Sequence, residues 1–196
     1  SLYGTRGRTM TGGMADAYGL GMVIGVGNSL LLSGPLGLFD NDVSNRSEKI
    51  QTFVLGSAWG GAVIGLLAAD HIKPTRAQVS VTSTIGLMGV ASTMLGFAIF
   101  QPDDLDGNTF ALVTAAGLDI GLGAGAGFAS KLDWSLSRAR LVGLSAFLGA
   151  LAGGGTSLLL IGENGDNNSG RLAAAVTLAG LWGGFALGTH LTSDMA

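Results

Sequence analysis

Charged residues in this chain fall in short clusters, and long apolar runs separate the clusters. Six runs carry no charge or nearly none: residues 17–39, 50–69, 77–102, 107–130, 141–162 and 172–189. Each run is close to the roughly 20 residues that a helix needs to cross a hydrocarbon layer about 30 Å thick. The spacing predicts an all-α integral membrane protein with six transmembrane helices, in a single membrane domain over residues 1–196.

Composition agrees with this interpretation. Charged residues make up 12% of the chain and the mean hydropathy is +0.50, whereas soluble domains carry roughly 25% charged residues. The net charge of −3 offers nucleic acid no basic field. Two alternatives stay open. An outer-membrane barrel needs alternating strands with aromatic girdles, and a soluble bundle would have to tolerate 35 glycines, each costing about 1 kcal/mol in a helix.

Cationic residues are unequally divided between the loops. One side of the predicted bundle holds seven of the ten Lys and Arg residues: Arg6, Arg8, Lys73, Arg76, Lys131, Arg138 and Arg140. The other side holds Arg46, Lys49 and Arg171. Because Lys and Arg accumulate in short cytoplasmic loops, both termini are expected in the cytoplasm. The expected location is the bacterial inner membrane.

A glycine pattern repeats in the odd-numbered runs. Residues 21–34 align without gaps on residues 149–162, at an offset of 128, and half that offset leads to Gly89 in the third run. The recurring glycines are Gly21, Gly25 and Gly27 in the first run and Gly149, Gly153 and Gly155 in the fifth. The repeat predicts three tandem helical hairpins, at about residues 9–70, 75–131 and 138–192.

The even-numbered runs repeat more weakly. Gly61 and Gly65 match Gly123 and Gly127 at an offset of 62, and then match Gly184 and Gly188 at a further 61. Trp59 and Trp182 recur in the same alignment.

Glycines four residues apart lie on one helical face and allow a neighbouring backbone to approach closely, as in a glycine zipper. These glycines are therefore expected to be helix-packing positions, either within the chain or toward another subunit. Trp59 and Trp182 are expected to fill gaps beside small residues on a partner helix.

Asp119 is the ionisable group nearest the middle of a predicted span. Such groups are costly in a membrane unless they are paired or hydrated. Asp119 is therefore a candidate ion or proton site, and with Ser29, Thr93 and Ser157 it would line a polar path through a channel or transporter. The alternative is a neutral acid that is hydrogen-bonded to a Ser or Thr of another span.

The outward loops carry alternating polar residues, as at Asp104, Asp106 and Asn108. Alternating oxygen ligands begin a calcium loop, but the bidentate Glu of a full site is missing. The same residue types cap helices and make tight turns, so these three residues are weak candidates for a metal site. No metal or cofactor is expected.

Architecturally, the chain resembles the proteolipids of rotary ATPases, in which helical hairpins have a Gly-rich first helix and a carboxylate on the returning helix. Asp119 alone matches that carboxylate, and the acidic loops depart from the family pattern. The sequence contains no phosphate loop, nucleophile elbow or metalloprotease motif. We therefore expect a non-enzymatic scaffold or structural subunit of a membrane assembly, in contact with lipid and with other subunits or further copies of itself. The alternative is an ion or small-solute channel or transporter that uses Asp119.

Overall fold

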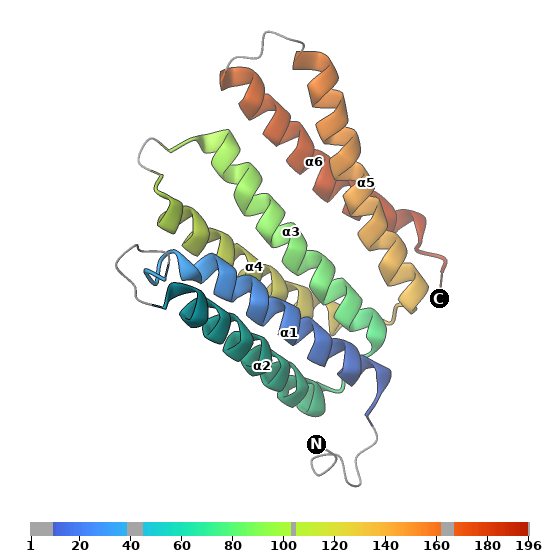
Figure 1. The fold of residues 1–196 in the computed structure, drawn as a ribbon. Coiled ribbons are helices and arrows are strands. Elements are labelled where there is room, and N and C mark those ends of the chain that lie inside the picture. The colour runs from blue at the N-terminus through green and yellow to red at the C-terminus, as the bar shows by residue number, and fades with distance from the viewer. Residues whose placement is uncertain (1–9, 39–44, 103–104, 162–166, 196) are drawn as a thin grey trace.

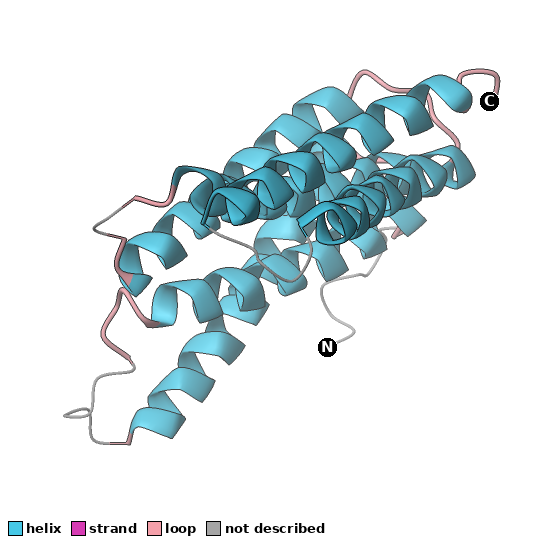
Figure 2. Ribbon diagram, turned by 90° about the horizontal axis from the view of Figure 1, so that it is seen from above, coloured by secondary structure: helices cyan, strands magenta, loops and turns pink. Residues whose placement is uncertain are grey.

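The computed structural model describes residues 10–38, 45–102, 105–161 and 167–195. They form six helices, α1 (Gly12–Ser33), α2 (Arg46–Ile72), α3 (Arg76–Phe100), α4 (Gly107–Ala129), α5 (Leu136–Ile161) and α6 (Asn167–Leu191). All six are long and apolar enough to cross a membrane. The described residues contain no strand (Figure 2), so the barrel alternative does not hold. This confirms the prediction of an all-helical chain with six membrane-length helices, as in a multi-pass membrane protein.

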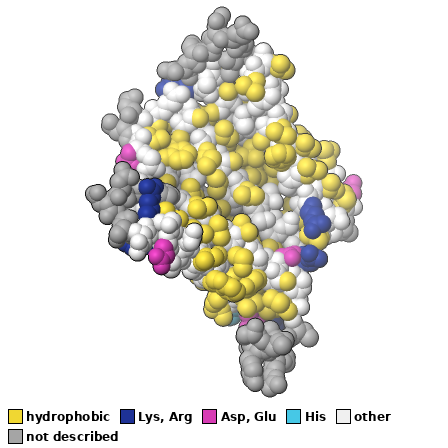
Figure 3. All heavy atoms as spheres, viewed as in Figure 1, with side chains coloured by type: hydrophobic (Ala, Val, Ile, Leu, Met, Phe, Trp, Pro, Cys, Tyr) yellow, Lys and Arg dark blue, Asp and Glu magenta, His cyan; other side chains and the backbone are white. Residues whose placement is uncertain are grey.

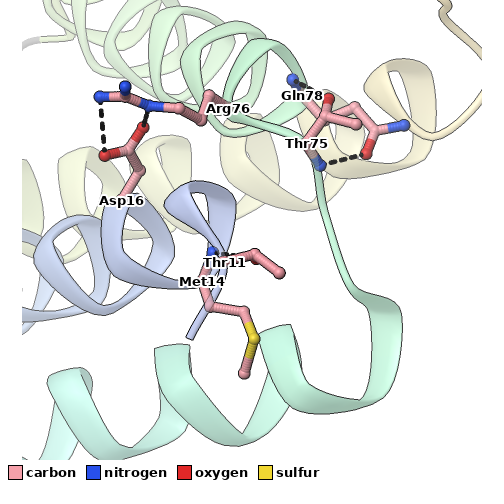
Figure 4. A network of polar contacts seen from close by, with 6 residues as sticks. All are labelled: Thr11, Met14, Asp16, Thr75, Arg76 and Gln78. Carbon is pink, nitrogen blue, oxygen red and sulfur yellow. Dashed lines mark hydrogen bonds and ion pairs between the residues drawn. The ribbon is translucent and has the colours of Figure 1, made fainter. Parts of the chain in front are cut away.

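The helix ends follow local sequence signals. The Thr75 side chain caps α3 by accepting the Gln78 backbone N–H at 3.2 Å, and the Gln78 side chain accepts the Thr75 backbone N–H at 2.9 Å (Figure 4). This reciprocal pair is a capping box. At the end of α2, Lys73 takes a left-handed conformation with φ of 50°, and Pro74 prevents the helix from continuing. The chain therefore reverses direction sharply between α2 and α3.

The helices are arranged in a row of three antiparallel pairs (Figure 1). The first pair is α1 with α2, the second is α3 with α4, and the third is α5 with α6; most contacts between helices lie within these pairs. The second pair lies in the middle, because α3 also contacts α1, α5 and α6. Among the described residues, the first and third pairs do not touch, and α2 contacts α1 alone. The row is therefore open at both ends.

The outer surface is apolar along the length of the helices. Hydrophobic side chains cover the middle of the face in Figure 3, and the charged groups on that face lie toward its margins. Val23, Leu87 and Leu151 occupy the same position in the three odd-numbered helices, and each is more than half exposed. In water such a surface would be costly, whereas lipid tails match it.

Candidate functional site

Helices within a pair touch backbone to backbone at glycines. A Cβ added to Gly21 would collide with the carbonyl oxygen of Gly61, and one added to Gly149 would collide with that of Gly180. The second pair repeats the arrangement between Gly89 and Gly117. At this separation the two helices gain dispersion and Cα–H···O contacts that a side chain would prevent.

The three pairs share one packing register. In the odd-numbered helices the offsets of 64 and 128 hold, since Gly25, Gly89 and Gly153 each approach a backbone carbonyl oxygen of the partner helix. Those carbonyl oxygens belong to Ser57, Gly117 and Val176. Equivalent residues of α2 and α4 are therefore 60 positions apart, and equivalent residues of α2 and α6 are 119 positions apart. The sequence alignment gave offsets of 62 and 123.

This corrects the predicted alignment of the even-numbered helices. Gly61 corresponds to Gly121 and Gly180, and Trp59 corresponds to Asp119. Glycine occupies every second residue from 121 to 127, so several registers match equally well on sequence. Only contact with the partner helix distinguishes them.

The predicted packing glycines divide accordingly into two groups. An added Cβ would come within 3.0 Å of another helix at nine of them, namely Gly21, Gly25, Gly61, Gly65, Gly89, Gly149, Gly153, Gly184 and Gly188. At Gly27 the nearest atom would be the Leu118 Cδ2, at 3.9 Å. Nothing lies within 4 Å at Gly123, Gly127 or Gly155. The alignment missed three glycines of α4 that face α3, Gly117, Gly121 and Gly125, together with Gly180 of α6.

The two tryptophans, each expected to fill a gap beside small residues of a partner helix, differ from each other in their surroundings. Trp59 is 62% exposed on the surface of α2. Trp182 is also exposed, but its Nε1–H donates a hydrogen bond to the Ser92 hydroxyl of α3 at 3.0 Å. Trp182 thus links the third pair to the second, whereas Trp59 projects from the end of the row, where the described residues place no further helix.

A groove of about 920 Å³ lies where α1 and α2 meet the carboxyl-terminal end of α4. It runs along α1 between α2 and α4, which do not contact each other. Small residues make up much of its lining, among them Gly21, Gly25, Gly61, Ala68, Ala126 and Gly127. Gly60 and Gly127 border it with no other atom within 4 Å of an added Cβ. The groove is therefore accessible from the side of the bundle.

The corresponding space between the second and third pairs is filled by aromatic rings. Phe128 of α4 and Phe185 of α6 have ring centroids 6.4 Å apart, and Trp182 packs on Phe185 at 6.3 Å. In the shared register, Ala68 of α2 occupies the position of Phe128, and Ala126 of α4 occupies that of Phe185. The groove is therefore the result of small side chains at two positions where the chain elsewhere has rings.

This relation predicts the effect of filling the groove. The double substitution Ala68→Phe with Ala126→Phe is expected to raise the thermal unfolding temperature in detergent, because aromatic pairs contribute about 0.5–1.5 kcal/mol beyond the area they bury. The control is Ala175→Phe, at an exposed position of α6, which should leave that temperature nearly unchanged. A lower unfolding temperature for the double variant would show that the two positions do not face a common space.

Asp119 and Asn28 form a polar pair beside the groove. The Asn28 Nδ2 of α1 donates to the Asp119 Oδ1 of α4 at 2.9 Å. Asn28 also lines the groove, while Asp119 is exposed near the middle of α4. The partner of the carboxylate is thus an amide and not the Ser or Thr that the sequence suggested. The repeat could have indicated this partner, because polar residues also occupy the equivalent positions of the other odd-numbered helices, Ser92 in α3 and Thr156 in α5.

The hydroxyl groups proposed for a polar path bond instead to their own helices. Ser29 donates to the Val26 carbonyl oxygen at 2.8 Å, and Ser157 donates to that of Gly154 at 2.7 Å. Thr93 donates to the Gly89 carbonyl oxygen at 2.9 Å. Ser29 and Ser157 are also buried. A hydroxyl that already donates within its helix is not free to donate to a passing solute.

The candidate metal residues have another role where the structure describes them. The Asp106 carboxylate caps α4 by accepting the Thr109 backbone N–H at 2.7 Å, and this bond holds the pKa of Asp106 below its usual range. Asn108 is exposed in the first turn of α4, and Asp104 lies outside the described residues. Within the described ranges, no group of three potential metal ligands occurs. For Asp106, the structure thus favours the capping interpretation.

An ion pair also joins two of the helix pairs. Near the start of α1, the Arg76 Nε of α3 lies 2.8 Å from the Asp16 Oδ2 and joins the first and second pairs (Figure 4). Both side chains are partly exposed, so the pair adds little stability by itself. It positions the ends of two helices that also contact each other further along.

Comparison of the chain with protein-family models, with curated proteins and with solved structures finds no match. Inference about its function therefore rests on three features of the chain itself. These are the glycine contacts within each helix pair, the Asn28–Asp119 hydrogen bond and the groove.

Proposed function

We propose that this chain is a non-enzymatic multi-pass membrane protein that acts as a scaffold or structural membrane subunit of a larger assembly. Its three helix pairs are interpreted as three tandem glycine-zipper hairpins. The observation that carries the proposal is that backbone contact at glycines forms the interior of each pair, which leaves the large apolar side chains directed outward. Lipid and neighbouring membrane proteins are the partners that such a surface suits.

The state of the polar groups supports a scaffold over a transporter. The hydroxyl groups of Ser29, Thr93 and Ser157 are engaged within their own helices. Asp119 is engaged by Asn28, which joins two helix pairs. In a membrane, such interhelical hydrogen bonds typically contribute about 0.6 kcal/mol and up to about 2 kcal/mol. Of these groups, the Asn28–Asp119 pair is the one that holds two helices together.

The loops provide a test of the membrane orientation. With both termini cytoplasmic, single cysteines replacing Asp42, Asp104 or Asn167 are expected to react with an impermeant thiol reagent added outside intact cells. Cysteines replacing Lys73 or Ser137 should react only after the cells are opened. The chain has no native Cys, so each variant reports one position. Labelling of both sets from the same side would contradict the six-span topology.

A second candidate function is transport of a cation or proton, and the Asn28–Asp119 pair beside the groove favours it. A carboxylate near the middle of a span is a common element of ion pathways. In this candidate function, Asp119 would bind the ion and exchange it through the groove.

Liposome flux decides between the two candidates. A scaffold reconstituted into liposomes should give no proton, cation or solute flux above that of empty liposomes, and Asp119→Asn should leave the native mass unchanged. Flux that the wild-type chain supports and Asp119→Asn abolishes would overturn the scaffold proposal in favour of transport. Asn28→Asp serves as the matched variant, because it adds a carboxylate at the same site.

A further inference from the structure

One contact between helix pairs occurs twice in the chain. Helix α1 packs against both α3 and α4, and α3 packs in the same way against both α5 and α6. Each of these two contacts includes one polar pair, although the partners on the even-numbered helices are not equivalent, since Asp119 corresponds to Leu178 and not to Trp182. Asn28 of α1 bonds Asp119 of α4, and Ser92, which is 64 residues after Asn28, accepts a hydrogen bond from Trp182 of α6. Helices α1 and α3 therefore each join their own pair to the following pair.

In α5, the face that would make this contact is uncovered. Thr84 of α3 lies against Gly143, where an added Cβ would be 2.9 Å from the Thr84 Oγ1, and Met88 packs in a cluster with Ala146. The residues 64 positions later are Leu148 and Ala152, and both are exposed. Leu141, Gly155 and Thr156 are exposed on the same helical face. This set of five residues is the α5 face.

At the other end of the row, the first pair carries the complementary surface uncovered. Leu178 and Trp182 of α6 pack against α3. The residues 119 positions earlier in α2 are Trp59 and Val63, which are 62% and 51% exposed. These two residues, Trp59 and Val63, form the first-pair face.

We propose that a second copy of this chain docks its first-pair face on the α5 face, so that copies join head to tail. The inference rests on the proposed structural function and specifies the partner. The chain itself shows that such faces associate, since equivalent helices make this contact twice between its own pairs. The contact is heterologous, so its repetition forms a ring or an extended row.

The new contact reproduces a polar pairing. Thr156 occupies the position of Asn28 in α5, and Trp59 occupies the position of Asp119 in α2. Between copies, the Trp59 side chain would lie against Thr156, as the Asp119 carboxylate lies against Asn28. This accounts for a tryptophan that is exposed near the middle of a membrane-length helix. It also accounts for Gly155, at which an added Cβ meets nothing within 4 Å, because its counterparts Gly27 and Ala91 face the following pair.

Disulfide crosslinking tests the proposal directly. The chain has no Cys, so a variant with Trp59→Cys and Thr156→Cys contains only the two introduced thiols. Oxidation in membranes is expected to give species at multiples of the 19.6 kDa chain mass, and a reductant should reverse them. The control joins Thr156→Cys with Ile120→Cys, since Ile120 adjoins Asp119 in sequence but is exposed on another face of α4. The control should remain at the mass of one chain.

A second variant tests the surfaces without cysteines. Val63→Trp is expected to reduce the native mass in detergent to one chain, while the same change at another exposed valine, Val23→Trp on α1, should retain the oligomer. Absence of crosslinked species, with the chain inserted and folded, would overturn the head-to-tail contact. Equal crosslinking in the Ile120 control would also overturn it. Neither result affects the structural function, which liposome flux tests separately.

Discussion

Leucine in place of Gly149 is expected to separate α5 from α6 and to destabilise the fold. The added Cβ would meet the Gly180 carbonyl oxygen, and the Gly184 Cα would be 2.9 Å away. Backbone atoms cannot rotate aside as side chains do, so the cost should reach or exceed the upper end of the usual 1 to 3 kcal/mol for overpacking. The measurement is thermal unfolding in detergent, followed by the loss of monodisperse protein. Gly21→Leu and Gly89→Leu should behave similarly in the other two pairs.

The matched control is Gly183→Leu on α6, three residues after Gly180. Nothing lies within 4 Å of an added Cβ at Gly183, so this variant should unfold close to the wild-type temperature. Equal destabilisation by both substitutions would mean that helix propensity and not backbone contact determines the effect. Equal tolerance would contradict the close packing itself.

Arginine in place of Leu87 is expected to prevent stable insertion of α3. Leu87 lies near the middle of α3 and is 67% exposed, so the charge would face lipid. A charged side chain at the centre of a membrane helix costs about 2.5–3.5 kcal/mol on insertion scales. The measurement is the fraction of protein that remains in carbonate-washed membranes.

The control for this substitution is Phe100→Arg at the end of the same helix. Phe100 is 79% exposed, but the long Arg side chain can reach the membrane surface from there. Its membrane fraction should stay close to that of the wild type. If Leu87→Arg instead gave a soluble, folded protein, the chain would be a water-soluble bundle.

The sequence was sufficient for the number and type of helices but not for how they associate. Charge-free runs of membrane length predicted all six helices, because the cost of a charge in hydrocarbon is large and depends little on neighbours. The register of the odd-numbered helices was also recovered, since Gly21 and Gly25 recur with few competing glycines nearby. In α4, the alternate glycines from Gly121 to Gly127 allowed a register two residues out of step.

The groove was beyond prediction from the sequence alone. Ala68 corresponds to the aromatic residue Phe128 in the next pair. This correspondence is visible only when the packing register is known. The pairing of Asp119 likewise depends on which helices touch. The amide of Asn28 lies 91 residues away in sequence, and no local pattern connects the two.

The contacts of this bundle are arranged in the order in which the chain is synthesised. Each glycine interface joins two consecutive helices, so a pair can close as soon as its second helix enters the membrane. The next pair then packs on a finished neighbour, and α1 need not wait for α5 or α6, which it does not contact. Mostly local contacts favour fast folding. Closing the pairs one after another also limits the time during which the glycine faces of the helices are exposed to other nascent chains. The same order would let gene duplication add a pair at either end without disturbing the pairs already present.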